Sequence, residues 1–265
     1  MKDLLQINLQ GKRALVCGAS QGIGQAVAYA LAEAGANVTL LARNKQRLED
    51  ITQRLPTLAE PHQFLIADFS NPAELKLLIE EELAGNPEYH ILINNTGGPA
   101  PGALIEAEED ELLLAFQMHL VTAHMLTKSL YPSMKEAGYG RVINIISTSV
   151  KEPIPNLGVS NTIRAAMASW AKTLSVEMGE LGITVNNVLP GYTATSRLES
   201  LIQSRAELTG KTPGEITKIM KEHVPAGRFA EPNETAAAVA FLCSDAASYI
   251  NGINLPVDGG RLHSL

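Results

Sequence analysis

Short apolar runs alternate with helix-sized segments along almost the whole chain, and this alternation limits the choice of fold more than any other feature. Seven runs have the length and composition of strands: 13–17, 37–42, 62–67, 90–93, 141–146, 183–189 and 253–257. Helical patterns between them occupy 22–34, 44–54, 72–84, 108–137, 158–180 and 233–243. Each helical segment is long enough to connect two parallel strands.

The strand-like runs are apolar throughout rather than alternating, which is typical of strands covered by helices on both faces. The order of elements therefore predicts an α/β fold with a doubly wound, parallel, seven-stranded sheet of the Rossmann-like type. A chain of 265 residues with 45% hydrophobic content is expected to form one large core, so 1–265 is predicted to be a single domain. Residues 190–230 break the rhythm and are predicted to be an excursion over an active-site mouth.

The charge balance excludes several classes of partner. With 21 basic against 28 acidic residues, no basic run and a pI near 5.4, we expect neither nucleic acid nor an anionic membrane as partner. No apolar run approaches the roughly 20 residues of a membrane span. Cys17 and Cys243 lie far apart, and the first residues contain no signal-peptide apolar stretch, so reduced thiols in a cytoplasmic protein are expected. We predict no metal site.

A glycine-rich turn follows the first strand and opens the first helix. In "CGASQGIG", Gly18, Gly22 and Gly24 allow a sharp turn and let backbone N–H groups approach a pyrophosphate at the positive end of the helix dipole. The predicted cofactor-binding residues of this turn are Gly18, Ser20, Gln21, Gly22, Ile23 and Gly24. The alternative is a turn that serves only close packing of helix and strand, but the strand before and the helix after favour a nucleotide.

The spacing Gly-x-x-x-Gly-x-Gly is accompanied by further motifs along nearly the whole chain. These are "CGASQGIG" at 17–24, "ADFS" at 67–70, "NNTGG" at 94–98, "GRVINIIS" at 140–147, "GITVNNVLPGYTAT" at 182–195 and "NGINLPVDGG" at 251–260. Together they make the chain resemble the short-chain dehydrogenase/reductase family, and in particular its 3-oxoacyl-carrier-protein-reductase-like members. The resemblance implies an NAD(P)-binding oxidoreductase.

The residue after the second strand favours NADP over NAD. An NAD site would place a carboxylate there for the ribose 2′-OH, whereas "LLARNKQR" offers Arg43, which can bind a 2′-phosphate. Ser20 and Asn44 could add donors nearby. The alternative for Arg43 is a solvated loop side chain.

The resemblance carries further cofactor contacts onto this sequence. It implies that Asp68 accepts a hydrogen bond from the adenine amino group. It places Asn95, Thr96 and Gly97 along the adenine ribose, with threonine where the family usually has alanine, and leaves Asn94 to tie neighbouring strands. It places Pro190, Gly191 and Thr195 at the nicotinamide carboxamide.

The catalytic positions depart from the family pattern. The family uses a serine, a tyrosine, a lysine four residues after it, and an asparagine in the preceding long helix. Ser147 matches the serine, but "SNTIRAAM" places Ser160 and Arg164 where Tyr-x-x-x-Lys is expected, and His119 stands at the asparagine position. A serine hydroxyl is a far weaker acid than a phenol, and arginine does not release protons at usable pH.

The altered set of residues suggests an altered proton path. Our hypothesis is that His119 supplies the proton, directly or through Ser160 or a water, while Ser147 and Arg164 stabilise the oxyanion and Arg164 also holds the ribose. The alternative is that His119 only packs in a polar network. The sequence thus predicts an NADP(H)-dependent oxidoreductase for a carbonyl or secondary alcohol, with a 3-oxoacyl-like compound as a candidate substrate. The alternative is a silent NADP(H)-binding sensor or scaffold. A serine hydrolase is disfavoured because no Gly-x-Ser-x-Gly elbow is present.

The family resemblance also implies a homo-oligomer, most simply a tetramer built on the helices 108–137 and 158–180. The candidate contact residues are Met118, Leu126, Leu130 and Trp170, with burial in the chain's own core as the alternative. The region Thr193–Phe229 is expected to form a substrate wall that suits an apolar substrate. Its apolar members are Leu198, Leu201, Ile202, Ile216 and Met220.

Overall fold

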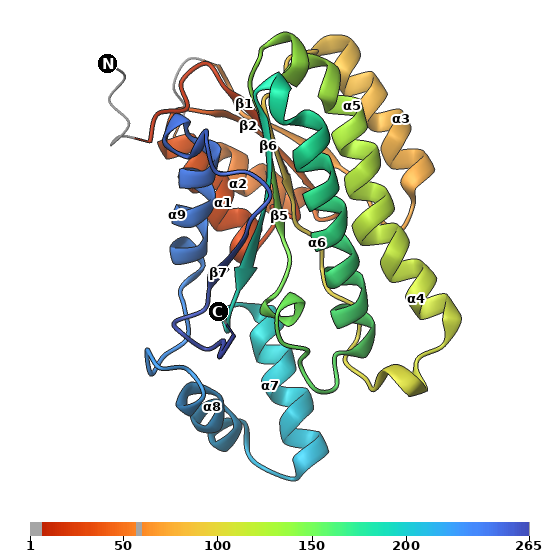
Figure 1. Ribbon diagram of the computed structural model, residues 1–265, viewed down its shortest axis with the longest axis vertical. Coiled ribbons are helices and arrows are strands. Elements are labelled where there is room, and N and C mark those ends of the chain that lie inside the picture. Colours follow the sequence, from red (N-terminus) through yellow and green to blue (C-terminus); the bar gives the residue numbers. More distant parts are fainter. Residues whose placement is uncertain (1–6, 57–59, 265) are drawn as a thin grey trace.

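A seven-stranded parallel sheet forms the centre of the computed structural model, which describes residues 7–56 and 60–264 (Figure 1). The strand order is β3-β2-β1-β4-β5-β6-β7, and every neighbouring pair is parallel. The strands are β1 (Arg13–Cys17), β2 (Asn37–Ala42), β3 (Gln63–Ile66), β4 (Ile91–Asn94), β5 (Gly140–Ile145), β6 (Ile183–Pro190) and β7 (Asn254–Val257). The predicted doubly wound fold is confirmed, with each strand found within a residue or so of its predicted limits.

Helices cover both faces of the sheet (Figure 1). One layer contains α1 (Gly22–Glu33), α2 (Lys45–Arg54) and α9 (Pro232–Cys243); the other contains α3 (Pro72–Gly85), α4 (Glu109–Phe116), α5 (Thr122–Glu136) and α6 (Gly158–Met178). Successive strand side chains point to opposite faces, so Val16 packs under the first layer and Leu15 under the second. This two-sided burial explains why the strands are apolar throughout.

A ladder of hydrogen-bonded asparagines crosses four neighbouring strands of the sheet. The Asn94 amide donates to Asn144 at 2.9 Å, and the Asn144 amide donates to Asn187 at 2.8 Å. The Asn187 amide then donates to Asn254 at 2.8 Å. These residues are paired in the register of β4, β5, β6 and β7, so a slip of one strand would break a chain of buried hydrogen bonds. The prediction that Asn94 ties neighbouring strands is confirmed.

The predicted helix 108–137 is interrupted by one π-helical turn, Gln117–Val121, between α4 and α5. The wider turn holds His119 in a buried position, and inserted π turns are frequent at functional sites. Leu126 and Leu130 lie in the core beneath α5, each 1% exposed. Their assignment as subunit contacts is therefore wrong.

The excursion 190–230 contains two helices, α7 (Ser196–Thr209) and α8 (Pro213–Glu222), below the sheet in Figure 1. The apolar side chains predicted to face a substrate pack against one another instead, in a cluster made by Leu198, Ile202, Ala206, Ile216 and Met220 with Leu201 beside it. They hold α7 to α8, so they give no reason to expect an apolar substrate.

Cys17 and Cys243 are free and buried, in the cores of opposite helix layers. Burial raises the pKa of each thiol to about 12, so neither is a reactive thiolate at neutral pH. Within the described residues, no group of side chains is arranged to hold a metal ion. No described helix is long and apolar enough to cross a bilayer.

Candidate active site

The predicted site residues gather at the carboxyl edge of the sheet. β1 and β4 are neighbours from which the chain proceeds in opposite directions, to β2 on one side and to β5 on the other. Open α/β sheets bind ligands in the crevice outside such a switch point. The turns after β1, β2, β3, β4, β5 and β6 all lie at this carboxyl edge, because all strands of the sheet are parallel.

The glycine-rich turn has the geometry of a phosphate cradle. Gly18 and Gly22 have positive φ of 60° and 58°. A Cβ at Gly24 would lie 2.2 Å from the Gly18 carbonyl oxygen, so α1 approaches the turn as closely as a backbone permits. The N-cap residue of α1, Gln21, makes no side-chain cap, and the first turn contains no acidic residue. The free N–H groups and positive dipole end of α1 therefore suit an anion.

The Asn95 side chain holds this turn in place by donating to the carbonyls of Cys17 and Gly18, at 3.3 and 3.4 Å. Thr195 closes the turn from the other side, because a Cβ at Gly22 would lie 3.1 Å from its Cγ2 atom. Thr195 also caps α7, accepting a hydrogen bond from the Leu198 N–H. The glycine turn after β1 and the turn after β6 are therefore in contact, which a dinucleotide that spans both turns requires.

Two guanidinium groups lie in the segment after β2, the strand that neighbours β1. Arg43 follows β2 with its side chain 75% exposed, and its Nη1 lies 3.7 Å from Asp68 Oδ2. The N–H and hydroxyl of Ser70 bind Asp68 and, together with Arg43, hold the pKa of this carboxyl below its usual range. Arg47 donates from Nη1 to Gln21 Oε1 at 2.5 Å. Asn44 caps α2 by accepting from the Arg47 N–H, so its side-chain oxygen is already used there.

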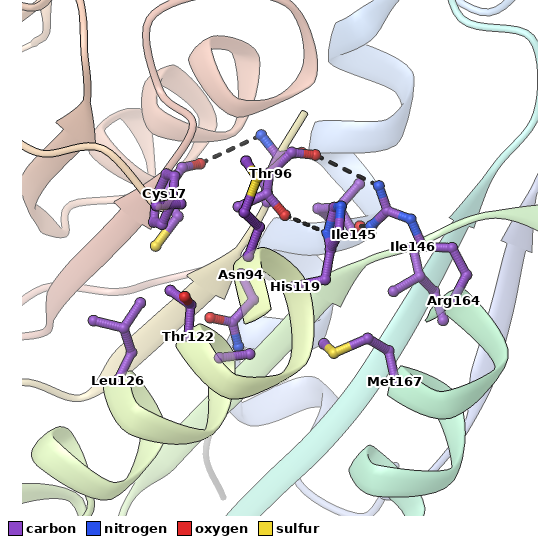
Figure 2. A pocket seen from close by; sticks show the side chains of 14 residues that line it. Cys17, Asn94, Thr96, His119, Thr122, Leu126, Ile145, Ile146, Arg164 and Met167 are labelled. Carbon is purple, nitrogen blue, oxygen red and sulfur yellow. Dashed lines mark hydrogen bonds between the residues drawn. The ribbon is translucent and has the colours of Figure 1, made fainter. Parts of the chain in front are cut away.

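A buried polar cluster lies between the β4 turn, the π-helical turn and α6 (Figure 2). His119 Nδ1 and Thr96 Oγ1 are 2.5 Å apart. Arg164 donates from Nη1 to the Ile145 carbonyl at 3.0 Å and from Nη2 to the Thr96 carbonyl at 3.5 Å. A narrow cavity beside these groups has room for about one water molecule, because the volume open to the centre of a water is about 10 Å³. Asn94 and Thr122 also line it.

The electrostatics of this cluster keep His119 neutral. Burial, with the Arg164 charge as the second cause, lowers the pKa of His119 to about 2, although a hydrogen bond with the Gly97 backbone acts in the opposite direction. The side chain is 4% exposed. A neutral ring at pH 7 carries no spare proton, so these electrostatics oppose His119 as a direct acid. The ring does belong to a polar network, as the alternative interpretation states.

His119→Asn is expected to make the protein less sensitive to acid, because asparagine keeps a polar partner for Thr96 but does not titrate. The unfolded chain binds a proton near pH 6.5 while the folded ring stays neutral, so wild type loses about 2 kcal/mol of unfolding free energy between pH 7 and pH 5 through this group alone. Urea unfolding at both pH values measures the difference. Equal losses in the two proteins would contradict the lowered pKa.

Ser147 and Ser160 are half-buried at the same edge. The Ser147 hydroxyl accepts a hydrogen bond from the Ser149 N–H at 3.0 Å, which leaves its proton free to be donated. Ser160 lies one helical turn before Arg164 on α6. A third residue at this edge is Gly191, directly after β6. A Cβ at this position would lie 2.6 Å from the Asp258 Cα, so position 191 requires glycine.

Comparison with known proteins agrees with this geometry. A family model described as "Enoyl-(Acyl carrier protein) reductase" matches residues 18–261. The chain is 34% identical over 254 residues to the 3-oxoacyl-[acyl-carrier-protein] reductase of Haemophilus influenzae, covering 95% of this chain and 98% of the relative. The chain belongs to the short-chain dehydrogenase/reductase family.

Solved structures of the family are similar over the same extent. The L-sorbose reductase of Gluconobacter frateurii, solved with NADPH and L-sorbose, has a TM-score of 0.90 at 29% identity and covers 98% of this chain and 100% of its own. A 3-oxoacyl (acyl-carrier-protein) reductase from Agrobacterium tumefaciens C58, solved with NADP bound, has a TM-score of 0.87 at 26% identity, with 98% of each chain covered. The fold of a family oxidoreductase is therefore present in full.

The sequence interpretation missed two arginines at this site. Arg47 lies four residues after Arg43, in the first turn of α2, and its place beyond the same strand could have indicated a second cation near the glycine turn. Arg197 follows the Thr195 cap and donates from Nη2 to the Pro99 carbonyl at 2.7 Å. No sequence pattern announces that contact, because it joins residues 98 positions apart.

Proposed function

We propose that this chain is an NADP(H)-dependent oxidoreductase that interconverts a carbonyl compound and a secondary alcohol through an altered proton path. The observation that carries the proposal is the glycine turn with its uncapped helix, closed by Thr195. Ser147 and Arg164 lie at the same sheet edge, where family members bind substrate and nicotinamide. NADP, rather than NAD, is favoured by Arg43 and Arg47 and by the absence of a carboxylate in the segment after β2.

The chain's own residues have distinct roles in this proposal. Bound NADPH supplies the hydride that reaches the carbonyl carbon. The backbone of Gly18–Gly24 holds the pyrophosphate, Asp68 and Asn95–Gly97 hold the adenosine side, and Pro190–Thr195 the carboxamide. Ser147 donates a hydrogen bond to the carbonyl oxygen, and the Arg164 charge stabilises the negative charge that develops on it.

The proton for that oxygen must come from a route that contains no phenol. A neutral imidazole can accept a proton at one ring nitrogen and release one from the other, so His119 suits a relay better than a reservoir. The Thr96 hydroxyl and a water in the small cavity can pass a proton to or from His119. Ser160 lies on α6, one helical turn before Arg164. We propose that the proton travels from solvent through this chain of groups.

Turnover separates the proposed enzyme from a silent nucleotide-binding protein. Quenching of protein fluorescence by NADPH measures binding, and loss of absorbance at 340 nm with a panel of ketones, aldehydes and 3-oxoacyl thioesters measures consumption. Binding with carbonyl-dependent oxidation is expected. Binding without consumption across the panel would instead identify a sensor or scaffold.

Arg43→Ala is expected to raise the Kd for NADPH by about 10- to 100-fold and to leave the Kd for NADH nearly unchanged, because one charge-assisted contact to the 2′-phosphate is lost. Fluorescence titration with both nucleotides gives the two constants. Arg54→Ala, at the far end of the helix α2 that follows Arg43, is the matched control. Equal losses for the two nucleotides would contradict 2′-phosphate recognition by Arg43.

We further propose that 1–265 forms a single NAD(P)-binding domain and that it assembles into a homo-oligomer, with a tetramer expected from the family, and works in the cytoplasm. Exposed apolar side chains on the outer face of α4 and the π-helical turn support an assembly surface. They include Leu113 (66% exposed), Phe116 (42%) and Val121 (40%). Sedimentation velocity measures the assembly state directly.

A further inference from the structure

Two guanidinium groups converge at the mouth of the site. A Cβ at Gly98 would lie 3.5 Å from Arg197 Nη2 and 3.8 Å from Arg164 Nη2, so both groups approach the same point above the β4 turn. Arg164 reaches it from within α6 and is 8% exposed. Arg197 reaches it from the first turn of α7 and is exposed. Two like charges this close repel each other, and an anion between them would relieve the repulsion.

Both groups bind only main-chain carbonyls among the residues 7–56 and 60–264. Arg164 donates to the carbonyls of Ile145 and Thr96, and Arg197 to that of Pro99. Other arginines of the chain have carboxylate partners, such as Arg13 with Glu60 and Arg228 with Glu234. A buried guanidinium without a counterion is costly, and each protonated fork still has donors free.

The pair lies close to the reacting centre. Arg164 binds the Ile145 carbonyl, two residues before Ser147 in the chain. Arg197 is two residues after Thr195, which closes the glycine turn. An anionic group between the two guanidinium groups would therefore lie at the same edge of the sheet as Ser147.

We propose that Arg164 and Arg197 together bind a carboxylate of the substrate, so that the substrates are oxo acids and the corresponding hydroxy acids. This inference rests on the proposed function and narrows its substrate class. A planar carboxylate can accept paired hydrogen bonds from a guanidinium fork, which an ester or an amide of the same skeleton cannot match. The apolar cluster of α7 and α8 faces inward and does not oppose an ionic substrate.

The first experiment needs no turnover. 2-Hydroxybutyrate and 3-hydroxybutyrate, each paired with its methyl ester, are titrated into protein saturated with NADPH, where an alcohol and the reduced cofactor cannot react. At least one acid is expected to bind about 10-fold or more tightly than its ester. Arg197→Gln, which can still donate to Pro99, is expected to bring the two affinities within about twofold. Arg205→Gln, later on α7, is the matched control and keeps the preference.

The second experiment measures kcat/KM for the matching oxo acids and their methyl esters. Wild type is expected to prefer the acid about 10-fold, and Arg197→Gln to lose this preference through a higher KM for the acid, whereas Arg205→Gln keeps the preference. Turnover without any preference for acids would overturn the carboxylate site and leave the proposed function intact. Binding of hydroxy acids that depends on Arg197, without NADPH consumption, would support the carboxylate site and reject the oxidoreductase.

One further result would overturn the inference. If Arg197→Gln weakens NADPH binding about 10-fold while the ratio of acid to ester affinity stays unchanged, the guanidinium pair serves the phosphates of the cofactor. NADPH titrations of Arg197→Gln and Arg205→Gln are therefore made before the hydroxy acids are added. Unchanged NADPH affinity in both variants is the expected result.

Discussion

Gly24→Ala is expected to abolish tight NADPH binding, with a rise in Kd of about 100-fold, and to lower the free energy of unfolding by about 1–3 kcal/mol. The new Cβ would lie 2.2 Å from the Gly18 carbonyl oxygen and 2.6 Å from Asn95 Nδ2. The first of these contacts is with main chain, so no side-chain rotation relieves it. α1 must move away from the turn, and its free N–H groups then no longer point at the pyrophosphate.

Fluorescence titration with NADPH and urea unfolding measure the two effects separately. Gly214→Ala is the matched control, because a Cβ there meets nothing within 4 Å. It is expected to change neither quantity appreciably. A Gly24→Ala protein that unfolds at lower urea concentration yet binds NADPH like wild type would show that this glycine serves packing alone.

Replacing Ser160 and Arg164 together by tyrosine and lysine is expected to raise kcat for uncharged ketones by about 10²- to 10³-fold. A phenol has a pKa of roughly 10, far below that of a serine hydroxyl, and positioned general acids contribute about 10²- to 10⁴-fold. The double variant Ser160→Tyr/Arg164→Lys supplies such an acid one helical turn before a cation. Uncharged ketones are chosen so that the loss of the Arg164 guanidinium fork does not affect substrate binding.

The control Ser160→Phe/Arg164→Lys has the same bulk and charge without the hydroxyl group. It is expected to be no faster than wild type at any pH. Steady-state rates of NADPH oxidation at saturating ketone, measured from pH 6 to pH 9, compare the three proteins. If the tyrosine and phenylalanine variants turn over equally slowly, the proton supply does not limit this site, and the proposed altered path is wrong.

Much of the fold could be predicted because its signals are local. The strand limits of β1 and β2 were predicted without error, since an uninterrupted apolar run bounded by polar residues defines a strand between two helix layers. The glycine spacing was equally informative, because only glycine has the positive φ of Gly18 and the close approach of Gly24 at low cost. The position of Arg43 at the carboxyl edge of the sheet could be predicted because the residue directly follows β2, and its contact with a 2′-phosphate stays a prediction.

The π-helical turn shows where local signals end. The segment 108–137 has one helical pattern, and no residue in it marks the change of pitch at Gln117–Val121. The apolar residues of α7 and α8 were equally ambiguous. Periodicity shows that such a face is buried but not by what, and here each helix covers the other.

By itself, the sequence determined the order of elements, the parallel sheet, the glycine-rich turn after β1 and the departure from Tyr-x-x-x-Lys at Ser160 and Arg164. Only the tertiary structure showed that the Arg164 charge acts on His119 and that Arg197 lies near Arg164. The pKa of His119 depends on its burial and on a charge 45 positions away in the chain, and the approach of Arg164 and Arg197 depends on how α6 and α7 pack. Desolvation and Coulomb interactions follow distance in space, which residue type and spacing in the chain do not record.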